Sequence, residues 1–305
     1  MTSEKEIGTI SKNTKSEPDL FQTIVFLAHM LPKNLVSFLT GYLVRIEFPE
    51  PLARFLNKCF VKIFGINMAE AELPIEDFKS IEEVFTRKLK ADARSIDSDF
   101  CSPADGFLAY SQALQSNQAI QAKGLSYCVS DLIFGETAEQ RTGKYSWFTT
   151  VYLAPHNYHR VHTPLGGRLL NVRYIPGELW PVNNPFVKRL PRLFVRNERL
   201  CFDIEVAKDA YAHVVMVGAL NVGRIASGFL GQEVTNSWER QFGTSPRNFP
   251  QNTCPTLKAG DELGTFMLGS TVVVVLDENA EKLFKLKSQE GDFPIELGRT
   301  LLAND

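Results

Sequence analysis

The chain has 305 residues, of which 44% are hydrophobic and 22% are charged, and these are values of an ordinary folded protein. They exclude a mainly disordered or collagen-like chain, and the length predicts about two domains or one large one. The net charge of -2 gives no support to nucleic-acid binding, which usually needs a concentrated basic face. The five cysteines are odd in number and form no C-x-x-C pair, which indicates reduced thiols in a cytosolic compartment.

The first part of the chain has helical patterns. Residues 1–18 are polar and mixed in charge, so we expect a mobile tail that is neither a signal peptide nor a membrane span. The apolar stretch 20–31 is too short to cross a bilayer, because a spanning helix needs roughly 20 residues. Segments 35–46 and 52–64 carry apolar residues at helical spacing, and a fourth helix is expected at 78–89. We therefore expect a helical region over 19–95.

The helix expected at 52–64 places Arg54, Lys58 and Lys62 along one line. Over residues 33–64 there are five basic and two acidic side chains, a local net charge of +3. Basic amphipathic helices of this kind suit an anionic membrane surface. The same apolar faces could instead pack on the core, because packed and interfacial amphipathic helices share one periodicity.

From residue 96 onward the pattern changes to strands and turns. Apolar segments bounded by Gly, Pro or Asn predict a mostly antiparallel β domain over 96–305, so the expected fold class is α+β with amphipathic helices before a β core. The segment 231–255 is rich in Gly, Asn, Gln, Ser and Pro and is expected to be a mobile or functional loop. The predicted strands are 107–110, 147–153, 168–175, 200–206 and 214–225.

A further strand is expected at 272–276, where a β-branched run indicates burial on both faces. Ser270 would be held on rigid structure at the mouth of this strand. Its oxygen could attack the carbonyl of Gly269 and turn an amide into an ester, if a nearby base removed its proton. Gly-Ser-Thr before a strand is also common turn chemistry, so these residues alone leave both interpretations open.

Three of the five histidines, His156, His159 and His162, fall within seven residues between two prolines. Histidine moves protons near neutral pH, so the cluster predicts a rigid functional turn. Imidazoles are also common zinc ligands, and histidines in a turn can simply satisfy backbone groups, so a metal site and a structural role stay open. No full ligand set, dinucleotide fingerprint or P-loop is visible in the sequence.

Several motifs together resemble the bacterial phosphatidylserine decarboxylases. They are Leu-Gly-Ser-Thr-Val at 268–272, Tyr-His-Arg-Val-His at 158–162 and Pro-Ala-Asp-Gly at 103–106, in the family's order. The chain departs from the family at Asn157, where members often carry Asp, and at His156, where they often carry another basic residue. Shorter matches extend the resemblance over about residues 20–290, at 123–127, 175–179, 196–199 and 217–219.

The resemblance implies a zymogen of phospholipid biosynthesis that converts phosphatidylserine to phosphatidylethanolamine and CO2 through a Schiff base to a pyruvoyl group. By motif, Asp105 would orient His162, and His162 would deprotonate Ser270 for a serine-protease-like self-cleavage. Cleavage between Gly269 and Ser270 would give a β chain of residues 1–269 and an α chain of residues 270–305. The α chain would begin with a covalent pyruvoyl cofactor made from Ser270, without metal or PLP. His159 would be the acid–base group of decarboxylation.

The resemblance also favours the membrane for the N-terminal helices. We expect a peripheral protein on the cytoplasmic side of the cell membrane, at an anionic surface, with phosphatidylserine as substrate and no nucleic-acid partner. The α and β chains would form a heterodimer, and two such heterodimers could pair. Two alternatives stay open: a zinc hydrolase or histidine phosphocarrier that uses His159 and His162, and a lipid-binding module without catalysis.

Overall fold

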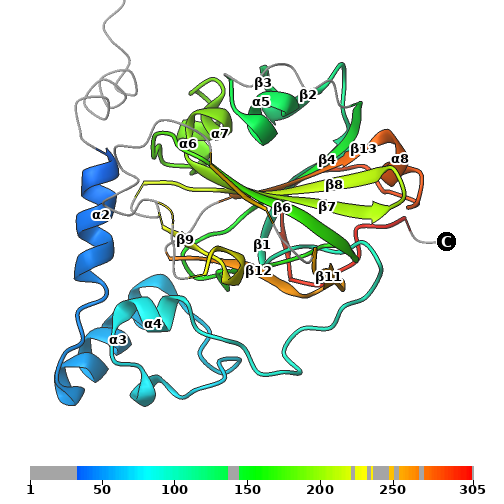
Figure 1. Ribbon diagram of the computed structural model, residues 1–305. Helices are drawn as coiled ribbons and strands as arrows, with labels where there is room; N and C mark the ends of the chain where they lie inside the picture. Colours follow the sequence, from blue (N-terminus) through cyan, green and yellow to red (C-terminus); the bar gives the residue numbers. More distant parts are fainter. Residues whose placement is uncertain are drawn as a thin grey trace, which may run out of the picture. The chain divides into compact units, whose positions relative to one another are not determined.

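A computed structural model gives the arrangement of the chain (Figure 1). The chain divides into two units after Pro32, and every described residue belongs to the second unit. The expected tail at 1–18, the apolar stretch at 20–31 and the expected cleavage site Gly269–Ser270 lie outside the described residues. The structure describes residues 33–136, 144–220, 224–231, 235, 247–250, 254–267 and 271–303.

The predicted antiparallel β core is confirmed. Among the described residues it is a nine-stranded sheet in the order β10-β6-β7-β8-β13-β4-β1-β14, with β11 paired to β6 as well. All of its pairings are antiparallel. The strands are β1 (Gly106–Ala113), β4 (Tyr145–Tyr152), β6 (Gly167–Ile175), β7 (Arg199–Ala207), β8 (Ala210–Val217), β10 (Arg247–Pro250), β11 (Thr256–Leu257), β13 (Thr271–Asp277) and β14 (Gln289–Ile295).

Strand β13 lies inside this sheet, between β4 and β8, and it is the strand expected after Ser270. Val273 pairs with Thr150 on one side and with Val215 on the other. Its residues from Val272 to Leu276 are all buried, which confirms burial on both faces. Each buried valine contributes about 1.5–3 kcal/mol relative to an exposed one, so the start of β13 is firmly fixed.

Smaller elements cover the two sides of the large sheet (Figure 1). On one side, a two-stranded hairpin and three short helices form a lobe: β2 (Gln118–Ala122), β3 (Leu125–Cys128), α5 (Val129–Phe134), α6 (Asn184–Val187) and α7 (Leu193–Arg196). On the other side lies a three-stranded sheet in the order β5-β12-β9, made of β5 (Arg160–His162), β12 (Glu262–Phe266) and β9 (Ile225–Ala226). The remaining short elements are η2 (Gly228–Leu230) and α8 (Glu278–Glu281).

The helices before the β core are α2 (Lys33–Leu43), α3 (Glu50–Phe64), η1 (Ile75–Asp77) and α4 (Ile81–Phe85). Helix α3 begins after Pro49 and ends at Gly65, whose φ of 68° is the left-handed conformation that glycine adopts at low cost. Within the part of the chain that the structure describes, no helix is long and apolar enough to cross a membrane.

Three expectations from the sequence are wrong in extent. The helix expected at 78–89 is one short helix, α4, because Ser80 caps its start and the chain beyond Thr86 is extended, where Leu89 bridges to Ala71. The strand expected at 214–225 is interrupted after β8, because the backbone turns at Gly218 to bond Glu198. Part of the loop expected at 231–255 is strand β10. All five cysteines are free thiols, as expected.

Candidate active site

The predicted catalytic histidines lie beside the strand that leads toward Ser270. Strand β5 pairs with β12, and Arg160 faces Thr265 in this pairing. The backbone N–H of Phe266 donates to the carbonyl of His159 at 2.9 Å. Strand β12 ends there, and Ser270 follows four residues later. The fold thus places His159 beside the end of β12 that leads to Ser270, and His162 opposite Glu262 at the start of that strand.

His162 is held as a neutral imidazole. Its Nδ1 lies 2.8 Å from the carbonyl oxygen of Gly260, and because a carbonyl only accepts, Nδ1 carries the proton. Its Nε2 lies 3.2 Å from the hydroxyl of Tyr158 and accepts from it. Burial lowers the pKa of His162, although the Gly260 contact opposes this effect. His162 therefore offers a basic Nε2 lone pair at neutral pH.

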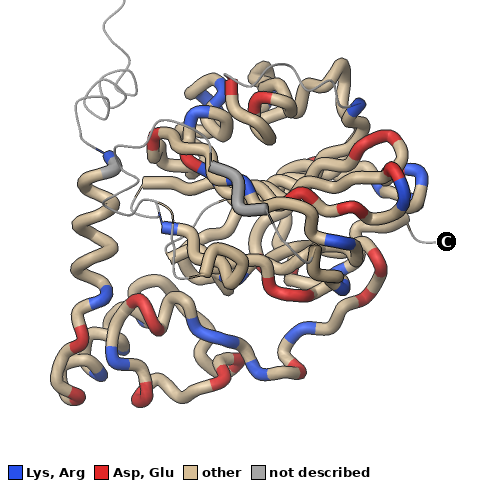
Figure 2. Tube along the Cα trace, in the orientation of Figure 1, with Lys and Arg blue, Asp and Glu red and all other residues tan. Residues whose placement is uncertain are grey.

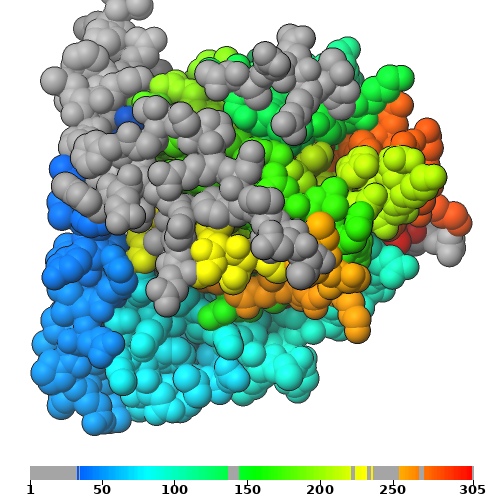
Figure 3. All heavy atoms as spheres, in the orientation of Figure 1, coloured from blue at the N-terminus to red at the C-terminus, as the bar shows by residue number. Residues whose placement is uncertain are grey.

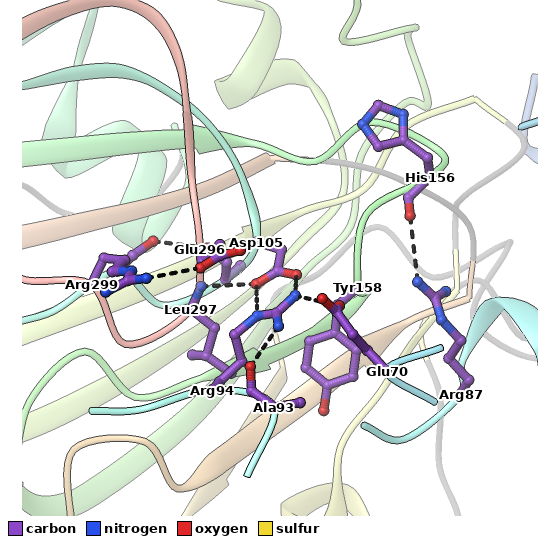
Figure 4. A network of polar contacts seen from close by, with 12 residues as sticks. Glu70, Arg87, Ala93, Arg94, Asp105, His156, Tyr158, Glu296, Leu297 and Arg299 are labelled. Carbon is purple, nitrogen blue, oxygen red and sulfur yellow. Dashed lines mark hydrogen bonds and ion pairs between the residues drawn. The ribbon is translucent and has the colours of Figure 1, made fainter. Parts of the chain in front are cut away.

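Asp105 is fixed by an arginine and not by the histidine (Figure 4). Arg94 donates through Nε to Oδ1 at 2.9 Å and through Nη2 to Oδ2 at 2.6 Å, and the backbone N–H of Leu297 donates to Oδ1 at 2.8 Å. The two main chains meet, since the N–H of His162 donates to the carbonyl of Pro103 at 2.8 Å. Among the described side chains, however, Asp105 makes no hydrogen bond to the His162 ring.

Asp105 still influences His162 through its charge, which favours the protonated imidazole and opposes the effect of burial on the pKa. Arg94 also contacts Glu70 at 3.0 Å, so this arginine lies between two carboxylates (Figure 4). The bidentate contact fixes the position of the Asp105 charge. The orienting role of Asp105 stays a prediction. In the structure Asp105 influences His162 through its charge, and its side chain is hydrogen-bonded to Arg94.

His159 is fully buried at 0% exposure. Its ring lies against that of Phe85, with centroids 3.8 Å apart and planes tilted by 32°. Neither ring nitrogen makes a well-formed hydrogen bond to a described residue, although a backbone contact with Asn157 favours the protonated ring. Burial, followed by the nearby charge of Arg87, lowers its pKa well below the usual value. A buried polar group without a partner costs about 1–3 kcal/mol, so an orphaned imidazole here indicates a functional group.

Arg87 is a residue of this region that the sequence did not single out. Its side chain is buried, its Nη2 donates to the carbonyl of His156 at 3.4 Å, and its Nε and Nη1 have no partner among the described residues. Next to it, the carbonyl of Thr86 accepts from Nε of Arg160 at 3.0 Å. The residues that follow α4 are therefore hydrogen-bonded to the segment 156–160. An arginine after a helical pattern usually lies at the surface, so the sequence around Arg87 did not indicate that its side chain is buried.

An apolar cavity of about 370 Å³ lies on the other side of Phe85. Phe60 and Phe64 of α3 line it together with Tyr152 of β4. Figure 2 shows no charged residue on α2 between Lys33 and Arg45, and Figure 3 shows α2 and α3 (blue) along one edge of the visible surface. Large hydrophobic side chains are exposed on these two helices: Leu35, Leu39, Tyr42, Leu43, Leu52, Phe55, Ile63 and Phe64.

Comparisons with known proteins fit this site. A model of the family described as phosphatidylserine decarboxylase matches residues 81–303. Relatives named phosphatidylserine decarboxylase proenzyme include those of Alcanivorax borkumensis, 40% identical over 85% of this chain and 88% of its own, and Myxococcus xanthus, 35% identical over 84% and 90%. That of Psychrobacter arcticus is 36% identical over 91% and 97%. The chain belongs to the phosphatidylserine decarboxylase family.

Membership in the phosphatidylserine decarboxylase family makes the chain an enzyme of the carboxy-lyase class, as the resemblance implied. The relatives' names describe proenzymes, which is the term for a zymogen. No group of three or more metal-binding side chains occurs among the described residues, and His156, His159 and His162 do not form one.

The described residues also fit a covalent group at position 270. On one side, Met267 is fixed through its N–H to the carbonyl of Arg224 at 2.9 Å. On the other side, Thr271 is buried at the start of β13 and pairs with Tyr152. His159, the residue whose ring is buried, also accepts the backbone N–H of Phe266 through its carbonyl. These contacts fix the described chain on both sides of the segment that contains residue 270.

Proposed function

We propose that this chain cleaves itself between Gly269 and Ser270 and then converts phosphatidylserine to phosphatidylethanolamine and CO2. One observation carries the proposal: His159 and His162, whose pKa values burial lowers, both lie on the segment paired along one side of the strand that leads into the predicted cleavage site. Family membership supports the reaction, and the word proenzyme in the relatives' names supports a precursor that is processed.

In the cleavage step, His162 Nε2 takes the proton of the Ser270 hydroxyl. The serine oxygen bonds to the carbonyl carbon of Gly269, the peptide C–N bond breaks, and the proton passes from His162 to the freed nitrogen, which leaves an ester and an amine. Loss of the Cα proton and of the Gly269 carboxylate breaks the ester's O–Cβ bond. One water then replaces nitrogen by oxygen at the former Cα and releases ammonia, which completes the pyruvoyl group. The α chain of 270–305 stays with the β chain because β13 is paired on both sides within the sheet.

When present, the pyruvoyl carbonyl supplies an electron sink for the electrons that departing CO2 leaves on the substrate. His159 is the general acid–base group of the proposed decarboxylation. Because burial and Arg87 keep His159 neutral, it first takes a proton from the substrate ammonium group. It then returns a proton to the substrate carbon after CO2 has left. The ring nitrogens are available for this exchange, since no described residue makes a well-formed hydrogen bond to them.

We also propose that α2 and α3 hold the enzyme at an anionic membrane surface, on the cytoplasmic side of the cell membrane. Their exposed apolar side chains support this, and the cavity behind Phe85 would admit the acyl tails of the substrate. The expected line of positive charge is partly neutralised, because Arg54 pairs with Glu50 at 3.3 Å and Lys58 with Glu76 at 3.2 Å. The apolar faces would therefore provide most of the attraction.

The proposed reaction is tested by CO2 release from phosphatidylserine in mixed micelles. The wild-type chain should release CO2, and Ser270→Ala should release none, because it has no hydroxyl from which a pyruvoyl group can form. Ser98→Ala is a control that removes a half-buried hydroxyl outside the proposed site, and it should release CO2 as wild type does. Turnover by Ser270→Ala at the wild-type rate would contradict the proposed chemistry.

A further inference from the structure

A second cavity, of about 220 Å³, lies between the large sheet and the lobe of β2, α6 and α7. Ala109, Thr150 and Thr271 line it from three neighbouring strands of the sheet. Tyr152 and Val182 line both this cavity and the apolar one, so their side chains stand between the two. We call this second space the hydroxyl cavity.

Buried hydroxyl groups face this region. Thr150 and Thr271 are 3% and 1% exposed, and Thr271 Oγ1 has no hydrogen-bond partner among the described residues. The side chain of Thr150 interacts with the buried hydroxyl of Tyr127, whose ring contacts Phe194 in the cavity wall. Buried hydroxyls of this kind are normally satisfied by protein or by ordered water. At about 30 Å³ per water in the liquid, the cavity has room for several molecules.

The hydroxyl cavity reaches solvent at a polar rim. Asn184 and Asp292 line it, both are exposed, and Nδ2 of Asn184 donates to Asp292 at 3.5 Å. The apolar cavity differs because it is lined mostly by aromatic and aliphatic side chains. A lipid tail in the apolar cavity would block water from that side, whereas the hydroxyl cavity would remain open.

The inner end of the hydroxyl cavity adjoins the proposed reaction centre through the covalent chain. Thr271 directly follows Ser270, and Cα atoms joined by a trans peptide lie about 3.8 Å apart. In the proposed function, the former Cα of Ser270 is the carbon that becomes the ketone. Water held on Thr271 Oγ1 would therefore be bound by the residue next to that carbon along the chain.

We propose that the hydroxyl cavity is a water-binding site whose water, held by Thr150 and Thr271, completes the conversion of residue 270. The inference rests on the proposed function. In this step one water adds across the C=N bond left after cleavage, the C–N bond breaks, and ammonia leaves with the proton balance unchanged. Release of the product amine in each turnover consumes one water in the same way. Both steps need water at that carbon while the lipid tails occupy the apolar cavity.

The test fills the cavity and follows the α chain by mass. Ala109→Leu places a larger apolar side chain among the hydroxyls, and Thr150→Val removes one hydroxyl at nearly constant volume. Ala113→Leu makes the same exchange at an exposed position of β1 that does not line the cavity. Each protein is quenched with borohydride, which turns a finished ketone into a hydroxyl and an unfinished imine into an amine.

We expect complete cleavage in all variants, with the amine form of the α chain about tenfold more abundant in Ala109→Leu and Thr150→Val than in wild type or Ala113→Leu. In steady state, the fraction of α chain trapped with lipid should rise in the same two variants. Equal amounts of the amine form in all four proteins would overturn the inference. If Ala109→Leu does not fold, Thr150→Val alone decides. An uncleaved wild-type chain would instead contradict the proposed function, so the two failures are distinguishable.

Discussion

The imidazole of His159 lies against the phenyl ring of Phe85, with their centroids 3.8 Å apart. This contact joins the two parts of the molecule that the proposed reaction needs, because Phe85 also lines the apolar cavity beside the helices. Phe85 thus lines the cavity proposed for the acyl tails, and its ring also covers the His159 imidazole. This packing contributes to the burial of His159, and burial lowers the pKa of the imidazole.

The two histidines should separate cleavage from turnover. His159→Ala is expected to cleave normally but to lose turnover by about 10²–10⁴-fold, the usual contribution of a general acid–base group. His162→Ala should remain uncleaved, because it lacks the Nε2 base. Gel analysis of the purified chains and CO2 release measure the two effects independently. The reverse pattern, in which His159→Ala blocks cleavage and retains turnover, would exchange the roles.

Arg87 should set the pH dependence of turnover. Its charge, together with burial, lowers the pKa of His159, so the neutral base persists to acidic pH. Arg87→Met removes the charge and should raise this pKa, so the acid limb of the kcat profile moves to higher pH. Arg87→Lys keeps the charge and should leave the limb near its wild-type position. An unshifted limb in Arg87→Met would show that Arg87 does not act on His159.

The buried pair of Arg94 and Asp105 should couple stability to cleavage. Asp105→Asn leaves the half-buried Arg94 guanidinium without its bidentate carboxylate, although Glu70 still pairs with it, so the cost should be about 1–3 kcal/mol. We expect a lower thermal midpoint together with slower cleavage. Arg94→Lys keeps a cation near Asp105 and should cleave faster than Asp105→Asn. Wild-type cleavage by a folded Asp105→Asn variant would remove Asp105 from the mechanism.

The exposed faces of α2 and α3 should determine membrane binding. Leu39→Gln combined with Phe55→Ser replaces two side chains that are 50% and 63% exposed, so the fold should be retained while binding to anionic liposomes falls. Leu283→Gln is a matched control, because Leu283 is 51% exposed but lies after α8. Flotation of the three proteins measures the difference. Equal flotation of the double variant and the control would contradict membrane binding through these helices.

The sequence predicted elements whose signal is local. The β-branched run before Leu276 identified β13, and apolar spacing with flanking prolines located α3. It overestimated α4, because apolar spacing continues to Leu89 although the backbone there pairs with Ala71. Apolar periodicity shows which side of a segment is apolar. It does not show whether the backbone N–H and C=O groups bond within a helix or to another segment of the chain.

The site was only partly predictable for the same reason. The motifs identified Asp105, His159 and His162, and the fold brings the two histidines to one strand pairing. The partner of Asp105 could not be foreseen, because Arg94 reaches it only through the folded path of the intervening chain. Arg87 was missed because its burial depends on residues far along the sequence. Gly269 and Ser270 lie outside the described residues, so cleavage stays a prediction.

The most direct test of self-cleavage is an intact mass spectrum of the freshly purified wild-type chain. The account predicts two species, one that ends at Gly269 and one that begins at residue 270 with a ketone in place of the serine amine. A single mass of the unmodified full-length chain, from protein that releases CO2 from phosphatidylserine, would contradict it.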